Sequence, residues 1–330
     1  MSRPLHLALK FPVNYNLPLP ASDTITEHRI MCETKNRMIW GHFSSAPKSS
    51  VSEKNRQRIC AQIREEQDSF TFFIANNRGE RELFVGRLNQ LYDRGQIPSK
   101  SHLTSFIPSY YSGVVGTSSE QVGVFVDVST FFKVDSKWLN NITLESSGQP
   151  VVEVKNARSV FLVNISEDLE KLLSELLTNP EENFQYQVEQ EDVSQDITIS
   201  DKPKKELPKK AGKRAGSFQR DAKTSKVAIV LAKYKCEIDD THQDFISKTT
   251  GENYVEAHHL IPISNQDKYE HSIDVEANIV SLCVSCHKKL HHAPYANIKP
   301  ILEKLYDARE TRLETCEIRI TKSELLECYK

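Results

Sequence analysis

The chain has 330 residues, of which 38% are hydrophobic and 27% charged, and its formal net charge is −2. This length suffices for two ordinary globular domains, and no segment approaches the ~20 apolar residues of a membrane helix. Lys10, Pro12, Pro18 and Pro20 interrupt the first twenty residues, which therefore lack a signal-peptide core. We expect a cytoplasmic protein with no membrane partner, in which the seven unevenly spaced cysteines favour metal binding over a disulfide framework.

Residues 1–185 have the mixed pattern of a domain that contains both strands and helices. Runs rich in β-branched and aromatic residues predict strands at 37–44, 70–76, 82–92, 122–134 and 159–165. We expect helices at 52–69, where Ser52 can serve as the cap, and at 166–177, where apolar residues recur at helical spacing. The order of these elements predicts a mixed α/β domain built on a curved sheet or a small barrel.

A break in composition at residues 186–216 predicts a charged linker between two domains. Residues 187–201 carry five acids and no Lys or Arg, whereas residues 202–226 carry ten Lys or Arg against two acids. Such a run is usually a solvated linker. A basic linker can also hold nucleic-acid phosphates through charge, and the composition alone does not separate the two interpretations.

Residues 217–330 form the predicted second domain and contain most of the potential metal ligands. We expect helices at 217–235, 297–314 and 320–329. Seven of the eleven histidines and three of the seven cysteines lie between 236 and 292. The pattern in chain order is Cys236, His242, His258, His259, Asn278, Cys283, Cys286, His287, His291 and His292.

The pair Cys283-x-x-Cys286 predicts a structural zinc site. Structural Zn²⁺ takes four nitrogen or sulfur ligands, and Cys236 can supply a third thiolate. For the fourth ligand we favour His242 over Asp239, because imidazole is a commoner partner of three thiolates than a carboxylate is. A redox-active cysteine pair is the alternative, which the upstream cysteine and histidine disfavour.

A group of histidines predicts a second metal site, of the kind that stays open to water. His287 and His291 are four residues apart on a helix that we expect to begin near Cys283, so they share one helical face. One member of the adjacent pair His258 and His259 can complete a catalytic metal site with them. Neighbouring residues on a strand point to opposite faces, so the other member is free to act as a base.

The segments "YVEAHHLIPIS" (254–264) and "NIVSLCVSCHKKLHH" (278–292) resemble HNH endonucleases of the ββα-metal class. More narrowly, they resemble the zinc-stapled HNH domains of modification-dependent restriction enzymes and other phage-defence nucleases. The resemblance spans about residues 217–330 and includes "YKCEIDDTHQDF" (234–245), which is similar to a Cys-then-His form of the first zinc arm. It implies an α+β chain that ends in a ββα-metal domain with a structural zinc.

The resemblance also implies roles for individual residues. In this family the first histidine of the pair binds the catalytic metal and the second is the general base, which assigns these roles to His258 and His259. Asn278 would brace the loop and orient the base. His287 would be a metal ligand, and His291 matches a further ligand found in some members.

The reaction implied is hydrolysis of a phosphodiester bond in double-stranded DNA, with Mg²⁺, Mn²⁺ or a similar divalent ion. The products would carry 5′-phosphate and 3′-hydroxyl ends. One such site cuts one strand, so double-strand cleavage predicts a homodimer. A zinc module without catalysis is disfavoured, because His258, His259, Asn278 and His287 are all present.

The first domain faintly resembles the PUA/EVE group of modified-base readers, through "MIWGHFS", a helix and "ELFVGRLNQLY". A reader of this kind would place a flipped base, such as a modified cytosine, against aromatic side chains. Trp40, which is followed by a glycine, and then Tyr110 and Tyr111 are the candidates, although aromatic residues in strands most often belong to the core. Alternatively, the first domain senses a protein or a small ligand, and the chain is a phage-defence effector nuclease.

Overall fold

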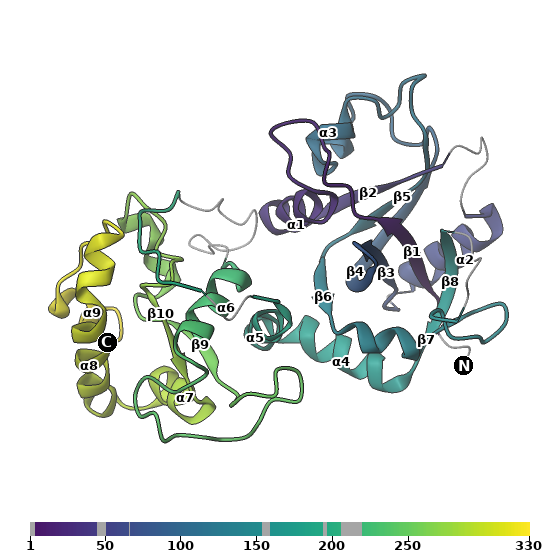
Figure 1. The fold of residues 1–330 in the computed structure, drawn as a ribbon. Coiled ribbons are helices and arrows are strands. Elements are labelled where there is room, and N and C mark those ends of the chain that lie inside the picture. The colour runs from purple at the N-terminus through teal and green to yellow at the C-terminus, as the bar shows by residue number, and fades with distance from the viewer. Residues whose placement is uncertain (1–3, 45–50, 66, 154–158, 194–196, 206–219) are drawn as a thin grey trace. The chain divides into compact units, whose positions relative to one another are not determined.

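The structure, a computed structural model, describes residues 4–44, 51–65, 67–153, 159–193, 197–205 and 220–330 (Figure 1). The chain forms two compact units, of which the first ends at Thr178 and the second begins at Asn179. The boundary that we expected at residue 185 falls within a helix, α5 (Pro180–Gln190), which belongs to the second unit.

The first unit contains a sheet whose strands are separated along the chain by several helices, and helix α4 follows the last strand. Its elements are β1 (His6–Pro12), α1 (Thr24–Lys35), β2 (Met38–Phe43), α2 (Glu53–Arg64), β3 (Phe70–Asn77), β4 (Glu80–Asp93), η1 (His102–Phe106), α3 (Ser109–Ser112), β5 (Val122–Val128), β6 (Phe132–Val134), η2 (Ser136–Asn141), β7 (Ile142–Leu144), β8 (Val160–Ile165) and α4 (Glu167–Thr178). The predicted helices at 52–69 and 166–177 correspond to α2 and α4. Ser52 caps α2 as expected, because its side chain accepts a hydrogen bond from the Asn55 amide at 3.3 Å.

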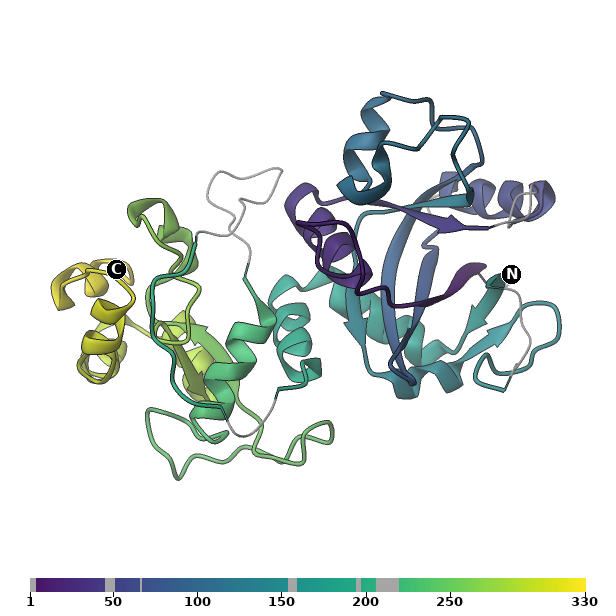
Figure 2. The ribbon, with the colours of Figure 1, turned by 45° about the horizontal axis from the view of Figure 1, so that its top comes forward.

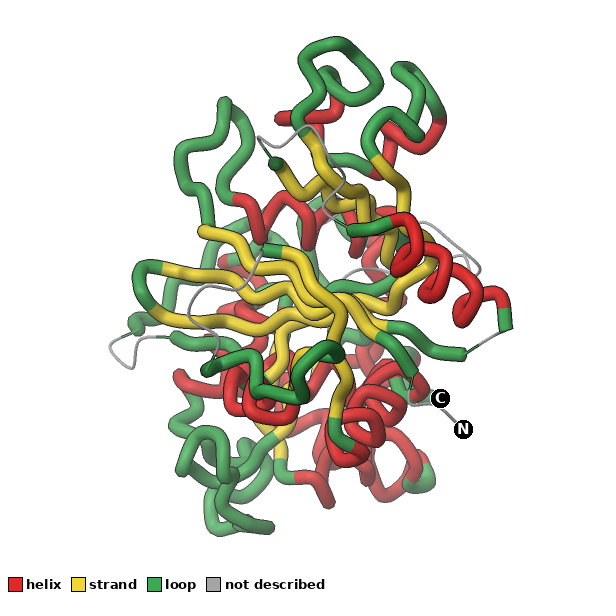
Figure 3. The backbone as a smooth tube through the Cα atoms, turned by 90° about the vertical axis from the view of Figure 1, so that its right-hand side faces the viewer, coloured by secondary structure: helices red, strands yellow, loops and turns green. Residues whose placement is uncertain are grey.

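The sheet has the strand order β2-β5-β4-β3-β1-β8-β7, and β6 pairs with β4. Figure 2 shows the strands of the first unit in purple to teal. β1 and β3 run parallel, and every other described pair is antiparallel. The path has two ends, β2 and β7, which do not pair with each other among the described residues. Of the two arrangements that we expected, the structure therefore has the open sheet, seen strongly twisted in Figure 3, and not a closed barrel.

The hairpin β3–β4 and the buried strand β5 follow from local sequence. Arg78 and Gly79, at the hairpin turn, have φ values of 52° and 97°, the left-handed pair that a tight two-residue turn requires. Strand β5 is buried at every position, which suits its Val- and Phe-rich sequence. One of those buried residues is Asp127, whose carboxylate is 0% exposed. A buried carboxylate needs hydrogen-bond donors, and Arg37 and Asn89 supply them.

The second unit is a two-stranded hairpin surrounded by helices. Its elements are α5 (Pro180–Gln190), α6 (Ala222–Leu231), β9 (Glu256–His259), η3 (Ile263–Lys268), β10 (Ile279–Leu282), α7 (Val284–His292), α8 (Tyr295–Thr315) and α9 (Lys322–Glu327). The predicted helix at 217–235 corresponds to the shorter α6, which starts after its cap Asp221 and ends before Lys233 and Tyr234, both with a φ of 55°. Residues 217–219 lie outside the described residues. The predicted helices at 297–314 and 320–329 correspond to α8 and α9. No described helix has the length and apolar character needed to cross a bilayer.

The predicted linker, residues 186–216, contains two described parts that pack on the second unit. One is the end of α5. The other is the segment 197–205, in which Asp201 pairs with Arg312 at 2.7 Å and Lys204 pairs with Glu276 at 3.0 Å. Residues 194–196 and 206–216, which carry much of the basic run, lie outside the described residues.

Candidate metal centres

Strands β9 and β10 and helix α7 position the histidines that the sequence singled out. β9 and β10 are antiparallel, with His258 opposite Val280 and His259 opposite Ile279. α7 begins directly after Cys283 and ends at His292. The predicted pattern of a strand leading into a helix near Cys283 is therefore confirmed.

Three imidazoles converge where β9 meets α7. His258, His287 and His291 each offer a nitrogen, and these atoms lie within 4.8 Å of one another. Burial lowers the pKa of His258 well below its usual value, and the neighbouring His287 and His291 lower it further. The same two kinds of effect, burial first, lower the pKa of His291. Neutral imidazoles keep a lone pair free, so this donor set fits a divalent metal ion.

Two further side chains support this histidine cluster, and sequence reasoning missed both. Glu256 Oε2 lies 2.5 Å from His287 Nδ1, and both side chains are buried. A carboxylate on Nδ1 fixes the tautomer of the ring and leaves Nε2 free to face a metal. Tyr329, near the C-terminus, places its hydroxyl 2.9 Å from His258 Nε2 and donates a hydrogen bond to the Leu260 carbonyl at 2.8 Å.

His259 has a different neighbour from His258. Its Nε2 atom lies 2.7 Å from Oδ1 of Asp274, and the two residues are only 6% and 3% exposed. The other carboxylate oxygen of Asp274 accepts a hydrogen bond from the backbone amide of Asp221, the cap of α6, at 2.6 Å. Asp274 is thus fixed on one side by a helix start and on the other by His259. No local sequence pattern pointed to this aspartate.

Asn278 braces the backbone on both sides of the His259–Asp274 pair. It is 0% exposed, and its side-chain amide donates to the carbonyls of Ile261 and Ile273 at 3.0 and 2.9 Å. Its side-chain oxygen accepts from the Ile261 amide at 2.7 Å. All of its bonds are therefore to backbone next to the pair, and a buried amide satisfied in this way holds those segments rigid.

A second cluster joins three thiols and one imidazole. The ligand atoms of Cys236, His242, Cys283 and Cys286 lie within 4.8 Å of one another. His242 Nδ1 is 3.3 Å from the Cys286 sulfur and 3.7 Å from the Cys283 sulfur. Three sulfurs and one nitrogen are a donor set that suits structural Zn²⁺.

Asp239, the alternative to His242 as the fourth zinc ligand, does not belong to this cluster. Asp239 Oδ1 instead accepts hydrogen bonds from the backbone amide and hydroxyl of Thr241, at 2.9 and 2.6 Å. Its other oxygen lies 3.6 Å from His242 Nε2. Burial raises the pKa of the Cys236 thiol, but backbone amides of Cys283 and Asp239 outweigh that effect, so the net shift is downward, toward the thiolate that zinc binds.

The aromatic residues that we expected to stack on a base lie in or beside the core of the first unit. Trp40 is 3% exposed, and its ring lies 3.8 Å from that of His28 and 4.9 Å from that of Phe73, centroid to centroid. Tyr110 is half-buried beside Tyr111, with ring centroids 4.8 Å apart. Trp40 therefore presents no free ring face to a base in this structure.

The glycine after Trp40 makes room for a core tyrosine and not for a ligand. A Cβ atom at Gly41 would lie 2.9 Å from the ring of Tyr111. The Tyr111 hydroxyl accepts from the Gly41 amide at 2.9 Å and donates to the Ile39 carbonyl at 3.2 Å. The expectation that this glycine admits a base is thus replaced by a packing role.

The hairpin, the helix after it and both clusters fall almost wholly within one segment that is similar to a known family. Residues 242–293 match the family model described as HNH endonuclease. The chain carries an HNH endonuclease domain. The resemblance seen in the sequence is confirmed for this segment, which contains every predicted metal ligand except Cys236.

A similar protein is the Type IV methyl-directed restriction enzyme EcoKMcrA of Escherichia coli (strain K12). It is 39% identical to this chain over 56 residues, which are 17% of this chain and 18% of the relative. The match therefore spans less than a fifth of either protein. An HNH endonuclease domain is a DNA-cleaving hydrolase domain.

Proposed function

We propose that this chain is a modification-dependent DNA endonuclease, in which the HNH domain hydrolyses phosphodiester bonds and the first unit reads a modified base. The observation that carries the nuclease half is the arrangement on β9, where His258 faces two helix histidines and His259 faces a buried carboxylate. The similarity to a methyl-directed restriction enzyme supports dependence on a methylated base, for which we propose a modified cytosine in foreign DNA.

The residues of the chain divide the chemistry as follows. His259 takes a proton from the attacking water through the ring nitrogen that Asp274 does not engage, and Asp274 holds the ring in place. The water oxygen bonds to phosphorus, the bond to the 3′ oxygen breaks, and the products carry a 5′-phosphate and a 3′-hydroxyl. His258, His287 and His291 would hold one divalent ion, Mg²⁺, Mn²⁺ or similar, which supplies neutralisation of the negative charge that grows at the phosphate and the leaving oxygen.

The cluster of Cys236, His242, Cys283 and Cys286 would hold a structural Zn²⁺. It ties the segment before β9 to the start of α7, which carries two of the catalytic-site histidines. Its thiols must stay reduced to bind zinc, which agrees with a cytoplasmic location. One HNH site cuts one strand, so cleavage of both strands of duplex DNA would require a homodimer.

The alternative, an effector nuclease whose first unit senses a protein or a small ligand, is favoured by one observation. Trp40 and Tyr111 are core residues, so the stacking surface expected of a base reader is not where the sequence suggested. Both proposals share the same nuclease site and differ only in what the first unit binds.

Cleavage of a matched DNA panel tests the proposal. The purified chain is incubated with plasmid DNA that is unmodified, or that carries 5-methylcytosine or 5-hydroxymethylcytosine. We expect cleavage of a modified substrate and loss of that cleavage in His259→Ala, whereas the control His271→Ala, a surface histidine paired with Glu317, should cleave normally. Equal cleavage of all DNAs would support the effector, and full activity of His259→Ala would contradict the nuclease mechanism.

A further inference from the structure

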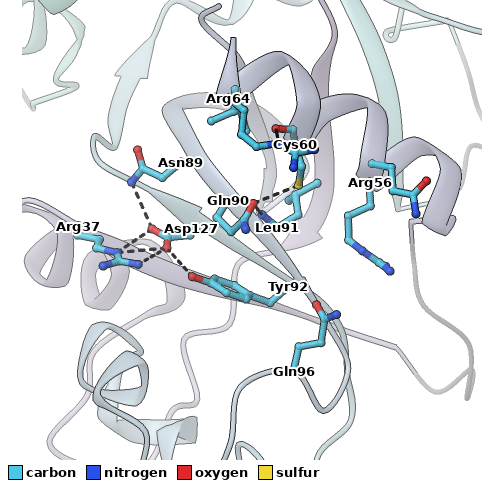
Figure 4. A pocket seen from close by; sticks show the side chains of 12 residues that line it. Arg37, Arg56, Cys60, Arg64, Asn89, Gln90, Leu91, Tyr92, Gln96 and Asp127 are labelled. Carbon is cyan, nitrogen blue, oxygen red and sulfur yellow. Dashed lines mark hydrogen bonds and ion pairs between the residues drawn. The ribbon is translucent and has the colours of Figure 1, made fainter. Parts of the chain in front are cut away.

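A hollow with a volume of about 690 Å³ lies on the first unit, between α2 and the second half of β4 (Figure 4). Its lining residues are Arg37, Arg56, Gln57, Cys60, Ile63, Arg64, Asn89, Gln90, Leu91, Tyr92, Gln96 and Asp127. A volume of this size falls in the range of small-molecule and cofactor sites. Neither the nuclease chemistry nor the zinc cluster uses any of these residues.

The floor of the hollow is built on a buried carboxylate, Asp127 of β5. Its Oδ1 accepts from Arg37 Nε at 3.0 Å and from Asn89 Nδ2 at 3.3 Å. Its Oδ2 accepts from Arg37 Nη2 at 2.5 Å and lies 3.5 Å from the hydroxyl of Tyr92 (Figure 4). The carboxylate is therefore saturated, and its role is to hold three side chains of the lining in fixed positions.

A β-bulge in β4 places Asn89 among the side chains that contact Asp127. The pairing of β4 with β5 shifts in register between Leu88 and Gln90, so Asn89 is an extra, bulged residue. A bulge redirects a side chain, and bulges are frequent beside binding sites. Here it turns Asn89 toward Asp127 at the floor of the hollow.

Three guanidinium groups line the hollow against one carboxylate, which gives it an excess of positive charge. Arg37 is the most constrained, since its bidentate bond to Asp127 is reinforced by stacking on the Phe106 ring at 4.6 Å. Arg56 pairs with Asp93, which does not line the hollow, and Arg64 is exposed at the end of α2. Guanidinium groups match a phosphate in geometry and charge, and the exposed Arg64 is the one placed to receive it.

The remaining lining suits a heterocyclic base. Four side-chain amides, of Gln57, Asn89, Gln90 and Gln96, offer both donors and acceptors, which is what pairing with a base edge requires. Tyr92 adds a half-buried aromatic ring on which a base can stack. A phosphate subsite beside a base subsite is the combination that a nucleotide needs.

We propose that this hollow is a nucleotide-binding site, with the phosphate on Arg64 and the base between Tyr92 and the amides. The inference rests on the proposed function where the nucleotide is a modified one extruded from DNA. The same chemistry also fits a free nucleotide, which is what a ligand-sensing effector would bind. The experiment below therefore has one arm for each source.

Binding is measured with the full chain carrying His259→Ala, so that DNA is not cut. One arm titrates 5-methyl-dCMP, dCMP and AMP by calorimetry. The other titrates labelled 20-base-pair duplexes that contain one 5-methylcytosine or none. We expect Arg64→Ala to weaken nucleotide binding about 10-fold, which is the usual effect of losing one charged hydrogen bond. The same variant should lower the salt dependence of DNA binding by about one phosphate contact. Arg58→Ala is the matched control, because Arg58 lies on the same helix, pairs with Glu145 and does not line the hollow; it should bind like the parent.

A second pair of variants tests the base subsite. Tyr92→Phe keeps the ring and should bind within about 2-fold of the parent, whereas Tyr92→Leu should lose about 10-fold by removing the stacking surface. Melting temperatures of both variants separate this loss from unfolding. If Tyr92→Leu melts early, Gln96→Ala, an exposed lining residue, replaces it and should also weaken binding.

The outcomes distinguish the site from the function. Weakened binding of modified duplex in the hollow variants, with Arg58→Ala unchanged, supports the site and the reader together. Weakened binding of free nucleotide alone supports the site and contradicts the reader. If the parent chain prefers modified DNA and no hollow variant alters that preference, or if no nucleotide or duplex binding responds to these variants, the site is wrong while the proposed nuclease is unaffected.

Discussion

His259 and Asp274 form a buried pair in which the imidazole Nε2 and the carboxylate Oδ1 are 2.7 Å apart. Asp274 can accept only if Nε2 carries the proton, which leaves the lone pair on Nδ1 available, as the proposed mechanism requires. Asn278 ties down the backbone after His259, at Ile261, and before Asp274, at Ile273. The orientation of the His259 ring thus depends on a carboxylate partner fifteen residues away in sequence and on the Asn278 side chain, which hydrogen-bonds to backbone and to neither side chain of the pair.

Asp274→Asn should slow DNA cleavage while preserving the fold. The substitution keeps the volume of the side chain, but an amide can present its nitrogen to His259 and favour the wrong tautomer. We expect the single-turnover cleavage rate to fall about 10²-fold, the lower end of what general base catalysis contributes. Asp221→Asn, which alters the neighbouring helix cap, is the control. An unchanged rate in Asp274→Asn would remove Asp274 from the mechanism.

Zinc removal should unfold the second unit, because binding and folding free energies are coupled in a zinc-stapled domain. Cys283→Ser should therefore yield protease-sensitive or insoluble protein without stoichiometric zinc. His242→Ala should lower the zinc content measured by metal analysis, and Asp239→Ala should leave it unchanged, since Asp239 lies outside the converging ligand atoms. The reverse result for this pair would assign the fourth ligand to the aspartate, and a folded, zinc-free Cys283→Ser would contradict the structural site.

Trp40→Ala should destabilise the first unit by about 3–5 kcal/mol, the usual cost of deleting a large buried aromatic side chain. From the sequence alone we expected Trp40 to lie outside the core, but its ring packs against His28 and Phe73 inside it. Urea unfolding followed by circular dichroism measures the loss, with Trp138→Ala, a half-buried tryptophan, as the control. Stability equal to the parent, with loss of DNA discrimination, would return Trp40 to base recognition.

The residues of the two candidate metal clusters were predictable because their signal is local. Cys283, Cys286, His287 and His291 lie on one helix turn after another, and the adjacent histidines lie on a four-residue strand. Glu256 was within reach of the same reasoning, because strand alternation places it on the face of His258, two residues later. Asp274 and Tyr329 were not, since only the fold brings a loop aspartate and a C-terminal tyrosine to the histidines.

The helices and strands were easier to predict from the sequence than the pairing of the strands in the sheet. Strand β1 was missed because Lys10 and Pro12 interrupt its apolar run, yet it pairs in parallel with β3 inside the sheet. Helix α5 was missed because it straddles the expected boundary between the first domain and the acidic start of the linker, although Asn179 followed by Pro180 is a helix-start signal. Which strands neighbour each other, and that the sheet stays open, depends on contacts distant in sequence that composition does not encode.

Two buried histidines should make the first unit less stable in mild acid. Burial lowers the pKa of His6 to about 4 and that of His28 to about 3, from an ordinary value of 6.5. His6 Nδ1 also accepts a hydrogen bond from the Phe70 amide at 3.1 Å, which requires the unprotonated ring. Since the unfolded chain binds these protons first, the stability is complete above pH 6.5 and is lost as the pH falls toward 4 for His6 and toward 3 for His28.

The expected loss between pH 7.5 and pH 5 is about 2 kcal/mol for each histidine. Both tryptophans of the chain lie in the first unit, so urea unfolding followed by tryptophan fluorescence reports on that unit alone. His6→Asn retains an acceptor for the Phe70 amide but does not titrate. It should therefore remove the part of the pH dependence that His6 contributes, even if it lowers the free energy of unfolding at pH 7.5. His102→Asn, on a 3-10 helix outside the core, should leave the dependence intact. A His6→Asn variant whose stability falls with pH as steeply as the parent's would show that His6 is not neutral in the fold.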